Sequence, residues 1–137
     1  MRVISYCKIS DHSIVLDGER QKDLESHIQG QSLGEKFDNL FKATRSDYPL
    51  FYRLDDFSKL GILAAELVLR KAGHDAITPK PEMGIILHTR TGTLYADSMY
   101  AQSIQDIVDF NPNPEIFSRL HPNAVCADIA LRNNITG

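Results

Sequence analysis

The sequence predicts an α/β protein in one domain, and three observations lead to this class. A β-prone hairpin pattern opens the chain, a long and unusually apolar helix pattern occupies its middle, and an uninterrupted apolar run at residues 83–87 follows that helix. Such a run suits a strand that is covered on both faces, as in a parallel sheet. A length of 137 residues fits a single domain.

The first element is predicted to be a β-hairpin. Residues 3–9 and 13–16 are short β-prone runs around the polar turn 10–12, and Asp17-Gly18 closes the second run. Residues 19–48 are polar, with scattered apolar positions. We expect this segment to be a loop with short helical pieces that lies on the surface.

The strongest helix signal is "RLDDFSKLGILAAELVLRKAG". Asp55 or Asp56 can cap its amino end, and Gly73 supplies a left-handed stop at its carboxyl end. Apolar residues cover most of its circumference, and a narrow polar stripe remains at Lys59, Glu66 and Arg70. We therefore expect this helix to be buried between layers.

Two further helices are predicted after the apolar run. "TRTGT" turns the chain, and an amphipathic helix follows from about Asp97 to Val108. The prolines of segment 111–114 end it, because a residue before proline is pushed out of the helical region. The last helix begins near Pro122 and continues to about Arg132, with Asn133, Asn134 and Gly137 as stop signals.

Composition argues against several classes of protein. The formal charge is -3, from 15 basic and 18 acidic residues in a mixed distribution, so no basic surface for nucleic acid is indicated. No apolar run is long enough for a membrane span, and no signal peptide is recognisable. Two cysteines make no disulfide framework. A cytoplasmic protein without cofactor or metal is expected.

Cysteine and histidine are the residue types most able to carry chemistry, and each has a simpler structural explanation. Cys126 is expected in the middle of the last helix among small apolar residues, where a thiol stays protonated, and Cys7 in a strand is read in the same way. The histidines, residues 12, 27, 74, 88 and 121, lack metal-binding spacing. His88 is the strongest candidate because it ends the predicted buried strand.

Two short motifs complete the candidates. Asp55 and Asp56 could be paired carboxylates, but adjacent side chains on a helix point about 100° apart, which favours capping. "HTRTGT" at residues 88–93 could bind phosphate, although it lacks the spacing of the known phosphate loops, which favours a tight turn.

Three blocks in order resemble the amino-terminal part of the β-ketoacyl synthases, the condensing enzymes of fatty-acid and polyketide synthesis. They are "DDFSKLGILAAELVLRKAG", "MGIILHTRTGTLYAD" and "NPEIFSRLHPNAVCADIALRNNITG". The resemblance covers roughly residues 54–137, and hardly includes 19–48, which is then a variable polar insertion. It implies a partial thiolase-like fold, with layered helices on a mixed sheet.

The resemblance also implies where the catalytic groups would be. Family members use a cysteine on a sharp turn after the next strand and two histidines far downstream, and no residue of this chain matches them. We therefore expect no catalytic, cofactor-binding or metal-binding residue, with Cys126 in the helix before the nucleophile strand and His121 structural.

Three functions remain open at this stage. The chain is a non-catalytic ketosynthase-like partner subunit, or it is the amino-terminal piece of an active 3-oxoacyl-[acyl-carrier-protein] synthase completed by residues or a chain not present here. A small unrelated enzyme that binds a phosphorylated ligand at "HTRTGT" is the third. The expected partners are a second copy (a dimer), another ketosynthase-like chain, or an acyl carrier protein.

Overall fold

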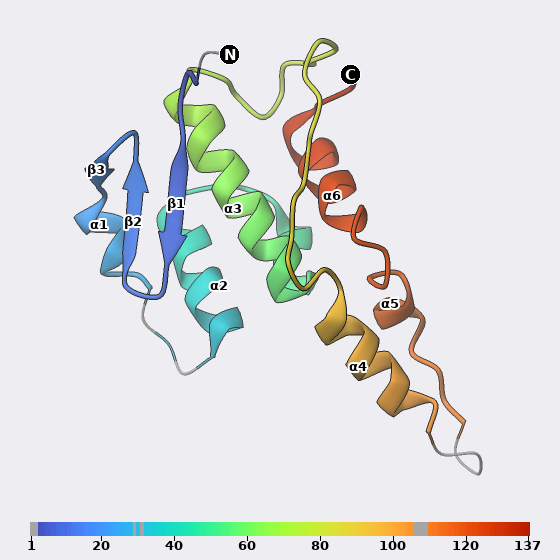
Figure 1. Cartoon of the computed structure of the whole chain (residues 1–137). Helices are drawn as coiled ribbons and strands as arrows, with labels where there is room; N and C mark the ends of the chain where they lie inside the picture. Colours follow the sequence, from blue (N-terminus) through green and yellow to red (C-terminus); the bar gives the residue numbers. More distant parts are fainter. Residues whose placement is uncertain (1–2, 29, 31, 106–109) are drawn as a thin grey trace.

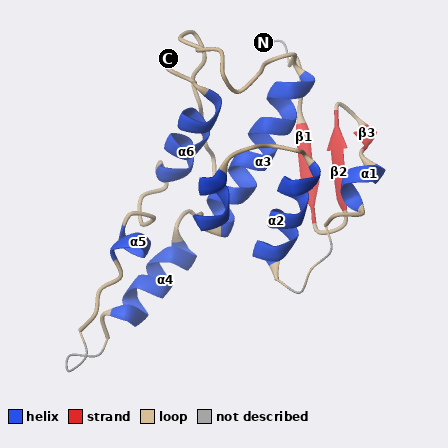
Figure 2. Ribbon diagram, turned by 180° about the vertical axis from the view of Figure 1, so that it is seen from behind, coloured by secondary structure: helices blue, strands red, loops and turns tan. Residues whose placement is uncertain are grey.

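The computed structural model describes residues 3–28, 30, 32–105 and 110–137. It confirms a mixed α/β protein, in which a small antiparallel sheet lies beside a group of helices (Figures 1 and 2). The elements in chain order are β1 Cys7–Ser10, β2 Ser13–Leu16, β3 Glu19–Arg20, α1 Lys22–Glu25, α2 Leu33–Ala43, the 3₁₀ helix η1 Pro49–Arg53, α3 Asp56–Lys71, α4 Leu94–Ser103, α5 Pro114–Phe117 and α6 Ala124–Asn133.

The predicted hairpin is confirmed. β1 and β2 pair antiparallel, with Cys7 opposite Leu16 and Ser10 opposite Ser13, and β3 adds a short third strand along β2. The helix α1 packs beside β2. Its Glu25 carboxylate accepts a hydrogen bond of 3.1 Å from the Ile14 amide of β2. This contact satisfies a backbone group that would otherwise be left open at a sheet edge.

Segment 19–48 differs from the expected surface loop. Its residues 33–43 form α2, which begins with a capping box between Ser32 and Glu35. Phe37, Leu40 and Phe41 lie on one face of α2 at helical spacing and are buried in the core. Phe41 stacks on Phe51 of η1, with ring centroids 3.8 Å apart. The expectation of a surface excursion is therefore wrong for α2, which is part of the main core.

The central helix α3 agrees with its prediction. The Asp55 carboxylate caps it by accepting a hydrogen bond of 2.7 Å from the Ser58 amide, and Gly73 follows its end with φ +83°. Every residue of α3 from Asp56 to Leu69 is buried or half-buried. It packs against the β-hairpin, α2 and α6, so it is enclosed by other elements as expected.

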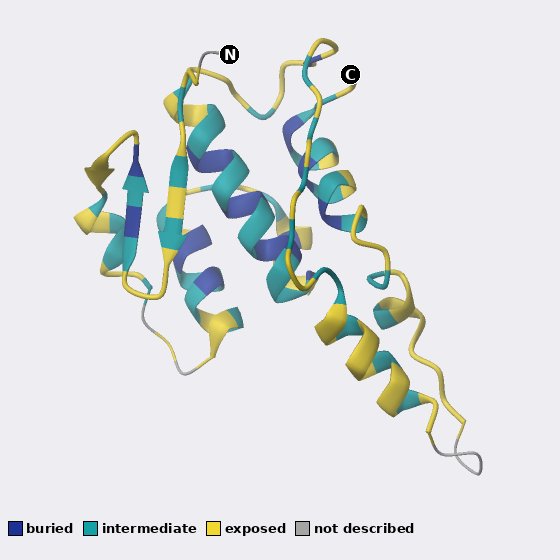
Figure 3. Cartoon of the chain, in the orientation of Figure 1, coloured by how far each residue is buried: buried dark blue, intermediate teal, exposed yellow. Residues whose placement is uncertain are grey.

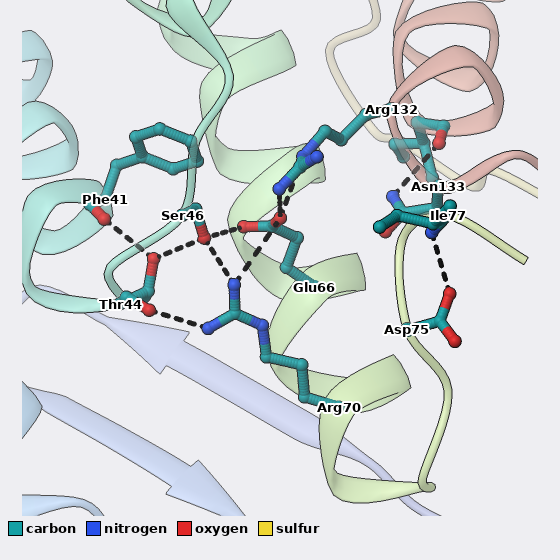
Figure 4. A network of polar contacts seen from close by, with 10 residues as sticks. Phe41, Thr44, Ser46, Glu66, Arg70, Asp75, Ile77, Arg132 and Asn133 are labelled. Carbon is teal, nitrogen blue, oxygen red and sulfur yellow. Dashed lines mark hydrogen bonds and ion pairs between the residues drawn. The ribbon is translucent and has the colours of Figure 1, made fainter.

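Two of the three residues in the polar stripe of α3, Lys59 and Glu66, face the interior, whereas Arg70 is exposed. Lys59 is 6 % exposed and forms an ion pair of 2.8 Å with Asp38 of α2. Glu66 is 2 % exposed and accepts hydrogen bonds from Ser46 at 2.7 Å and from Arg132 of α6 at 2.9 Å (Figure 4). Because each buried charge has a partner of opposite sign, the stripe connects α3 to its neighbours.

The helix α6 packs closely on α3 through a glycine. The last helix was predicted from near Pro122 to Arg132, and α6 confirms it, with Asn134 as a left-handed cap at φ 52°. A Cβ atom built on Gly61 of α3 would lie 2.6 Å from a methyl group of Val125 and 3.3 Å from Ile129. Both of these side chains are buried, so the contact admits no added methyl group without displacement.

The apolar run after α3 does not form the predicted strand. Residues 83–89 are extended but unpaired, and burial alternates along them, with Ile86 98 % exposed. Ile85 and Leu87 pack against the core on the other face. The expectation of a strand covered on both faces is wrong, because within the described part of the chain no strand lies beside this segment. A single parallel bridge, Lys80 to Ile135, precedes it.

The helices α4 and α5 form an arm that projects from the body (Figures 1 and 3). A helix expected from about Asp97 to Val108 is found at 94–103, and 106–109 lie outside the described residues. Its apolar residues do not gather on one face, so the expected amphipathic character is wrong. α4 contains no buried residue, and it contacts α5 through the Tyr100 and Phe117 rings, whose centroids are 5.5 Å apart. Over the described residues, no helix is long and apolar enough to cross a bilayer.

We expect Gly61→Ala to lower the free energy of unfolding by about 1–3 kcal/mol, although alanine is the better helix former by about 1 kcal/mol. The reason is the overlap with Val125, which denaturant unfolding can measure. The double variant Gly61→Ala/Val125→Ala should lose less stability than the sum of its single variants. Simple additivity would contradict the close α3–α6 contact.

We expect Arg132→Met to destabilise the protein by about 3–5 kcal/mol, because it leaves the buried Glu66 carboxylate without its closest cation. Arg132→Met/Glu66→Leu should recover most of this loss, since two apolar side chains then replace the buried pair. The comparison uses the unfolding free energies of both variants. Equal losses in the single and double variants would show that packing, and not charge pairing, controls this contact.

Candidate functional site

An open cleft lies at the amino end of α3, at the base of the projecting arm. Its volume is about 740 Å³, within the usual range for ligand-binding pockets. The lining is mainly apolar and comes from α2, α3, the loop before α4, α4 itself and the segment after α5: Leu33, Asp55, Asp56, Phe57, Thr91, Gly92, Thr93, Leu94, Tyr95, Ala96, Ser98 and Arg119. The cleft can therefore hold an apolar side chain or ligand.

Two of the charged groups that line the cleft, Arg119 and Asp55, lie close together, whereas Asp56 forms no ion pair among the described residues. The Arg119 guanidinium lies 3.8 Å from the Asp55 carboxylate and forms a closer ion pair with Asp128 of α6. Asp55 also caps α3 through the Ser58 amide. Because Arg119 is held by two carboxylates, it is not a free anchor for an anionic ligand. The apolar walls then dominate what the cleft can bind.

Two of the apolar lining residues are strongly exposed. Leu94 and Tyr95 begin α4 and are 63 % and 73 % exposed. Met99 and Phe117 carry this surface along the arm and are 39 % and 53 % exposed. An exposed apolar surface beside an apolar cleft is typical of a site that another molecule covers.

Sequence reasoning found only part of this cleft. The prediction that Asp55 caps a helix is confirmed, whereas the contribution of Arg119 was missed. Arg119 is far from Asp55 in the sequence, and no local spacing connects the two. Leu94 and Tyr95 stand among polar residues in the sequence. They could have been recognised as exposed apolar side chains if the helix had been predicted to begin at residue 94.

The two cysteines lie in different environments. Cys126 is the third residue of α6 and is half-buried, so the expected position in the middle of the helix is wrong. Cys7 lies in β1, as expected, and burial raises the pKa of its thiol from 9.0 to about 11. The Cys7 thiol is therefore protonated near neutral pH, which is unfavourable for a nucleophile.

The histidines do not assemble into a site. All five side chains are exposed. His88 follows an unpaired extended segment, so its expected place at the end of a buried strand is wrong. Among the described residues no group of histidine, cysteine, aspartate and glutamate has metal-binding geometry. The fold thus gives none of these histidines a neighbouring thiol or carboxylate cluster.

The segment "HTRTGT" forms the turn that was expected. Gly92 has φ +56°, and its amide donates a hydrogen bond of 3.0 Å to the Thr89 hydroxyl. This amide is consequently engaged within the loop and does not point at a ligand. The turn leads directly into α4 and supplies Thr91, Gly92 and Thr93 to the wall of the cleft.

Comparison of the chain with protein-family models, with curated proteins and with solved structures gives no match. The cleft and its surroundings are therefore interpreted from their own geometry and from the sequence blocks described above.

We expect alkylation to separate the two thiols. The pKa of the Cys7 thiol is 9.0 in the unfolded chain and about 11 in the fold. Below pH 9, the fraction of Cys7 present as thiolate is therefore roughly 100-fold lower in the folded protein than in the unfolded chain. Iodoacetamide at pH 8 should thus modify Cys126 before Cys7 in the native protein, and both equally in denaturant. Mass spectrometry of the peptides measures which cysteine is alkylated first. Rapid labelling of Cys7 in the native protein would contradict this prediction.

The same pKa shift gives a pH dependence of stability. Burial of the protonated Cys7 thiol contributes stability that is complete below pH 9 and is lost as the pH rises through about 11. Cys7→Ser should remove this part of the alkaline loss, measured as the difference in unfolding free energy between pH 8 and pH 11. An unchanged alkaline loss in Cys7→Ser would assign it to other groups.

Proposed function

We propose that this protein is a β-ketoacyl-synthase-like partner subunit without condensing activity of its own. Three ordered sequence blocks support the family assignment, and the corresponding helices α3 and α6 pack against each other in the core. The proposed fold is the amino-terminal part of a thiolase-like domain. The proposed role belongs to fatty-acid or polyketide synthesis in the cytoplasm.

The apolar cleft at the base of the α4–α5 arm is the observation that carries this proposal. A helix without buried residues gains little from its own chain, and its apolar side chains are stabilised when a partner covers them. Leu94 and Tyr95 lie where the arm meets the cleft. A binding role fits this surface better than a catalytic one, because no cysteine or histidine is found among the described residues that line it.

The proposed partner at this cleft is a ketosynthase-like chain. An acyl carrier protein fits the cleft less well, because carriers are acidic, this chain carries a formal charge of -3, and the Arg119 cation at the rim is already paired. The alternative proposal is an amino-terminal piece of an active synthase completed by residues or a chain not present here. The unpaired extended segment 83–89 favours that alternative, since an added strand would complete its hydrogen bonds.

We expect the purified chain to bind a ketosynthase that retains its nucleophilic cysteine, and to remain unacylated when it is mixed with an acyl-carrier thioester. Leu94→Asp should weaken the association tenfold or more, because it places a charge in the apolar contact. Calorimetry measures the binding, and intact-protein mass spectrometry measures acylation.

Leu131→Asp is the matched control for this experiment. Leu131 is 77 % exposed on α6 and does not line the cleft, so its replacement should leave the association unchanged. An acyl group found on Cys126 would overturn the non-catalytic role. Equal effects of the two aspartate variants, or no association at all, would overturn the assignment of the cleft as the partner site.

A further inference from the structure

The cleft at the amino end of α3 has an excess of negative charge. Asp55 and Asp56 line it together with one cation, Arg119. Arg119 forms its closer ion pair with Asp128 of α6, so three carboxylates lie on or beside the cleft with one guanidinium. No further charged side chain is found among the described residues that line it. A cation therefore enters this cleft more favourably than an anion.

Asp56 is the carboxylate that remains available to another molecule. Among the described residues it takes part in no ion pair, and its carboxylate accepts no hydrogen bond. Asp55, in contrast, caps α3 through the Ser58 amide and lies beside Arg119. Because Asp56 is half-buried, it has already lost part of its contact with water, and a cationic group that reaches it gains a charge-assisted contact.

The lysine of the same helix does not neutralise Asp56. A Cβ atom built on Gly34 would lie 3.1 Å from the Asp56 carboxylate and 3.9 Å from the Lys59 ammonium group, so α2 passes close to both. Lys59 is buried and paired with Asp38 at 2.8 Å, and it is not among the residues that line the cleft. Asp56 thus lines the cleft without a cation of its own.

Apolar side chains surround this carboxylate in the wall of the cleft. Leu33 comes from α2, Phe57 follows Asp56 on α3, and Leu94 and Tyr95 come from α4. Leu33 is 52 % exposed, and the two residues of α4 are more exposed still. An occupant that covers these side chains gains from apolar burial. Lysine and arginine suit such a site, because each joins an apolar stem to a cation.

The cleft lies apart from the carboxyl-terminal residues of the chain. Residues 135–137 run beside residues 80–83, at the end of the molecule opposite to the start of α4 (Figure 1). The residues that line the cleft come instead from α2, from the amino end of α3, from α4 with the turn before it, and from Arg119. The charge and the apolar walls of the cleft are therefore independent of the contact made by residues 135–137.

We infer that the cleft selects a positively charged segment of its protein partner, in which a lysine or arginine stands next to an apolar side chain. The apolar side chain covers the walls, and the cation pairs with Asp56. This inference deepens the proposed binding role and rests on it for the use of the cleft as a docking site. An anionic segment is disfavoured, because it would approach an excess of carboxylates and a guanidinium that is already paired.

Two matched peptides test the selection on the full chain. Both are blocked at their ends and carry two adjacent leucines, and one flanking residue is lysine in the first peptide and glutamate in the second. In a titration followed by NMR of the protein amides, the lysine peptide should bind about tenfold more tightly and shift the amides of Thr91, Gly92 and Thr93. Equal affinities, tighter binding of the glutamate peptide, or no binding of either would overturn the inference.

Asp56→Asn tests the carboxylate without removing the cap of α3. It should weaken binding of the lysine peptide about threefold to tenfold and leave the affinity of a glutamine peptide unchanged. Asp11→Asn is the matched control, because it makes the same change of charge in the exposed turn of the hairpin. Circular dichroism on heating verifies that both variants are folded. Equal losses of affinity in the two variants would overturn the role of Asp56.

The charge selection and the proposed ketosynthase-type partner fail in different experiments. A preference for the lysine peptide without association with a ketosynthase would retain the inference and overturn the proposed partner. Association with a ketosynthase that Leu94→Asp weakens, together with equal affinities for the two peptides, would retain the proposed function and overturn the inference.

Discussion

The buried carboxylate of Glu66 is the interaction on which the arrangement of the helices depends. It accepts hydrogen bonds from Arg132 of α6 and from Ser46 beyond α2, while Arg70 lies 3.9 Å away (Figure 4). Arg70 also donates to the Thr44 carbonyl at 2.6 Å, which closes the network around the end of α2. A buried charge tolerates few alternative arrangements, because each of them would leave it without partners.

The two halves of the structure differ in packing. From β1 to α3, apolar side chains of the sheet, α2, η1 and α3 form one core, and α6 joins it through the close contact at Gly61. The segment between α3 and α6 is held mainly at its ends. Lys80 donates to the carbonyls of Thr78 and Asn133, and Arg119 pairs with Asp55 and Asp128. Residues 83–89 and the α4–α5 arm consequently keep apolar groups exposed between two anchored points.

The exposed apolar groups lie on two surfaces of the molecule. The cleft at the amino end of α3 has apolar walls, and the Arg119 cation at its rim is paired with Asp55 and Asp128. Along residues 83–90, half-buried and exposed side chains alternate, and Ile86 is among the exposed ones. Among the described residues, neither surface joins a thiol to a histidine or a metal-binding group. Both surfaces leave apolar side chains in contact with solvent.

Local signals in the sequence were enough to predict the hairpin, the capped helix α3 and the last helix, since turns, caps and stop residues act over a few positions. The sequence by itself also determined that α3 is enclosed, because its apolar residues surround the axis. Only the tertiary structure decided that Lys59 and Glu66 face inward and that α2 belongs to the core, since their partners are distant in the chain. It also decided that residues 83–89 remain unpaired, because an apolar run predicts an extended chain but cannot supply the neighbouring strand.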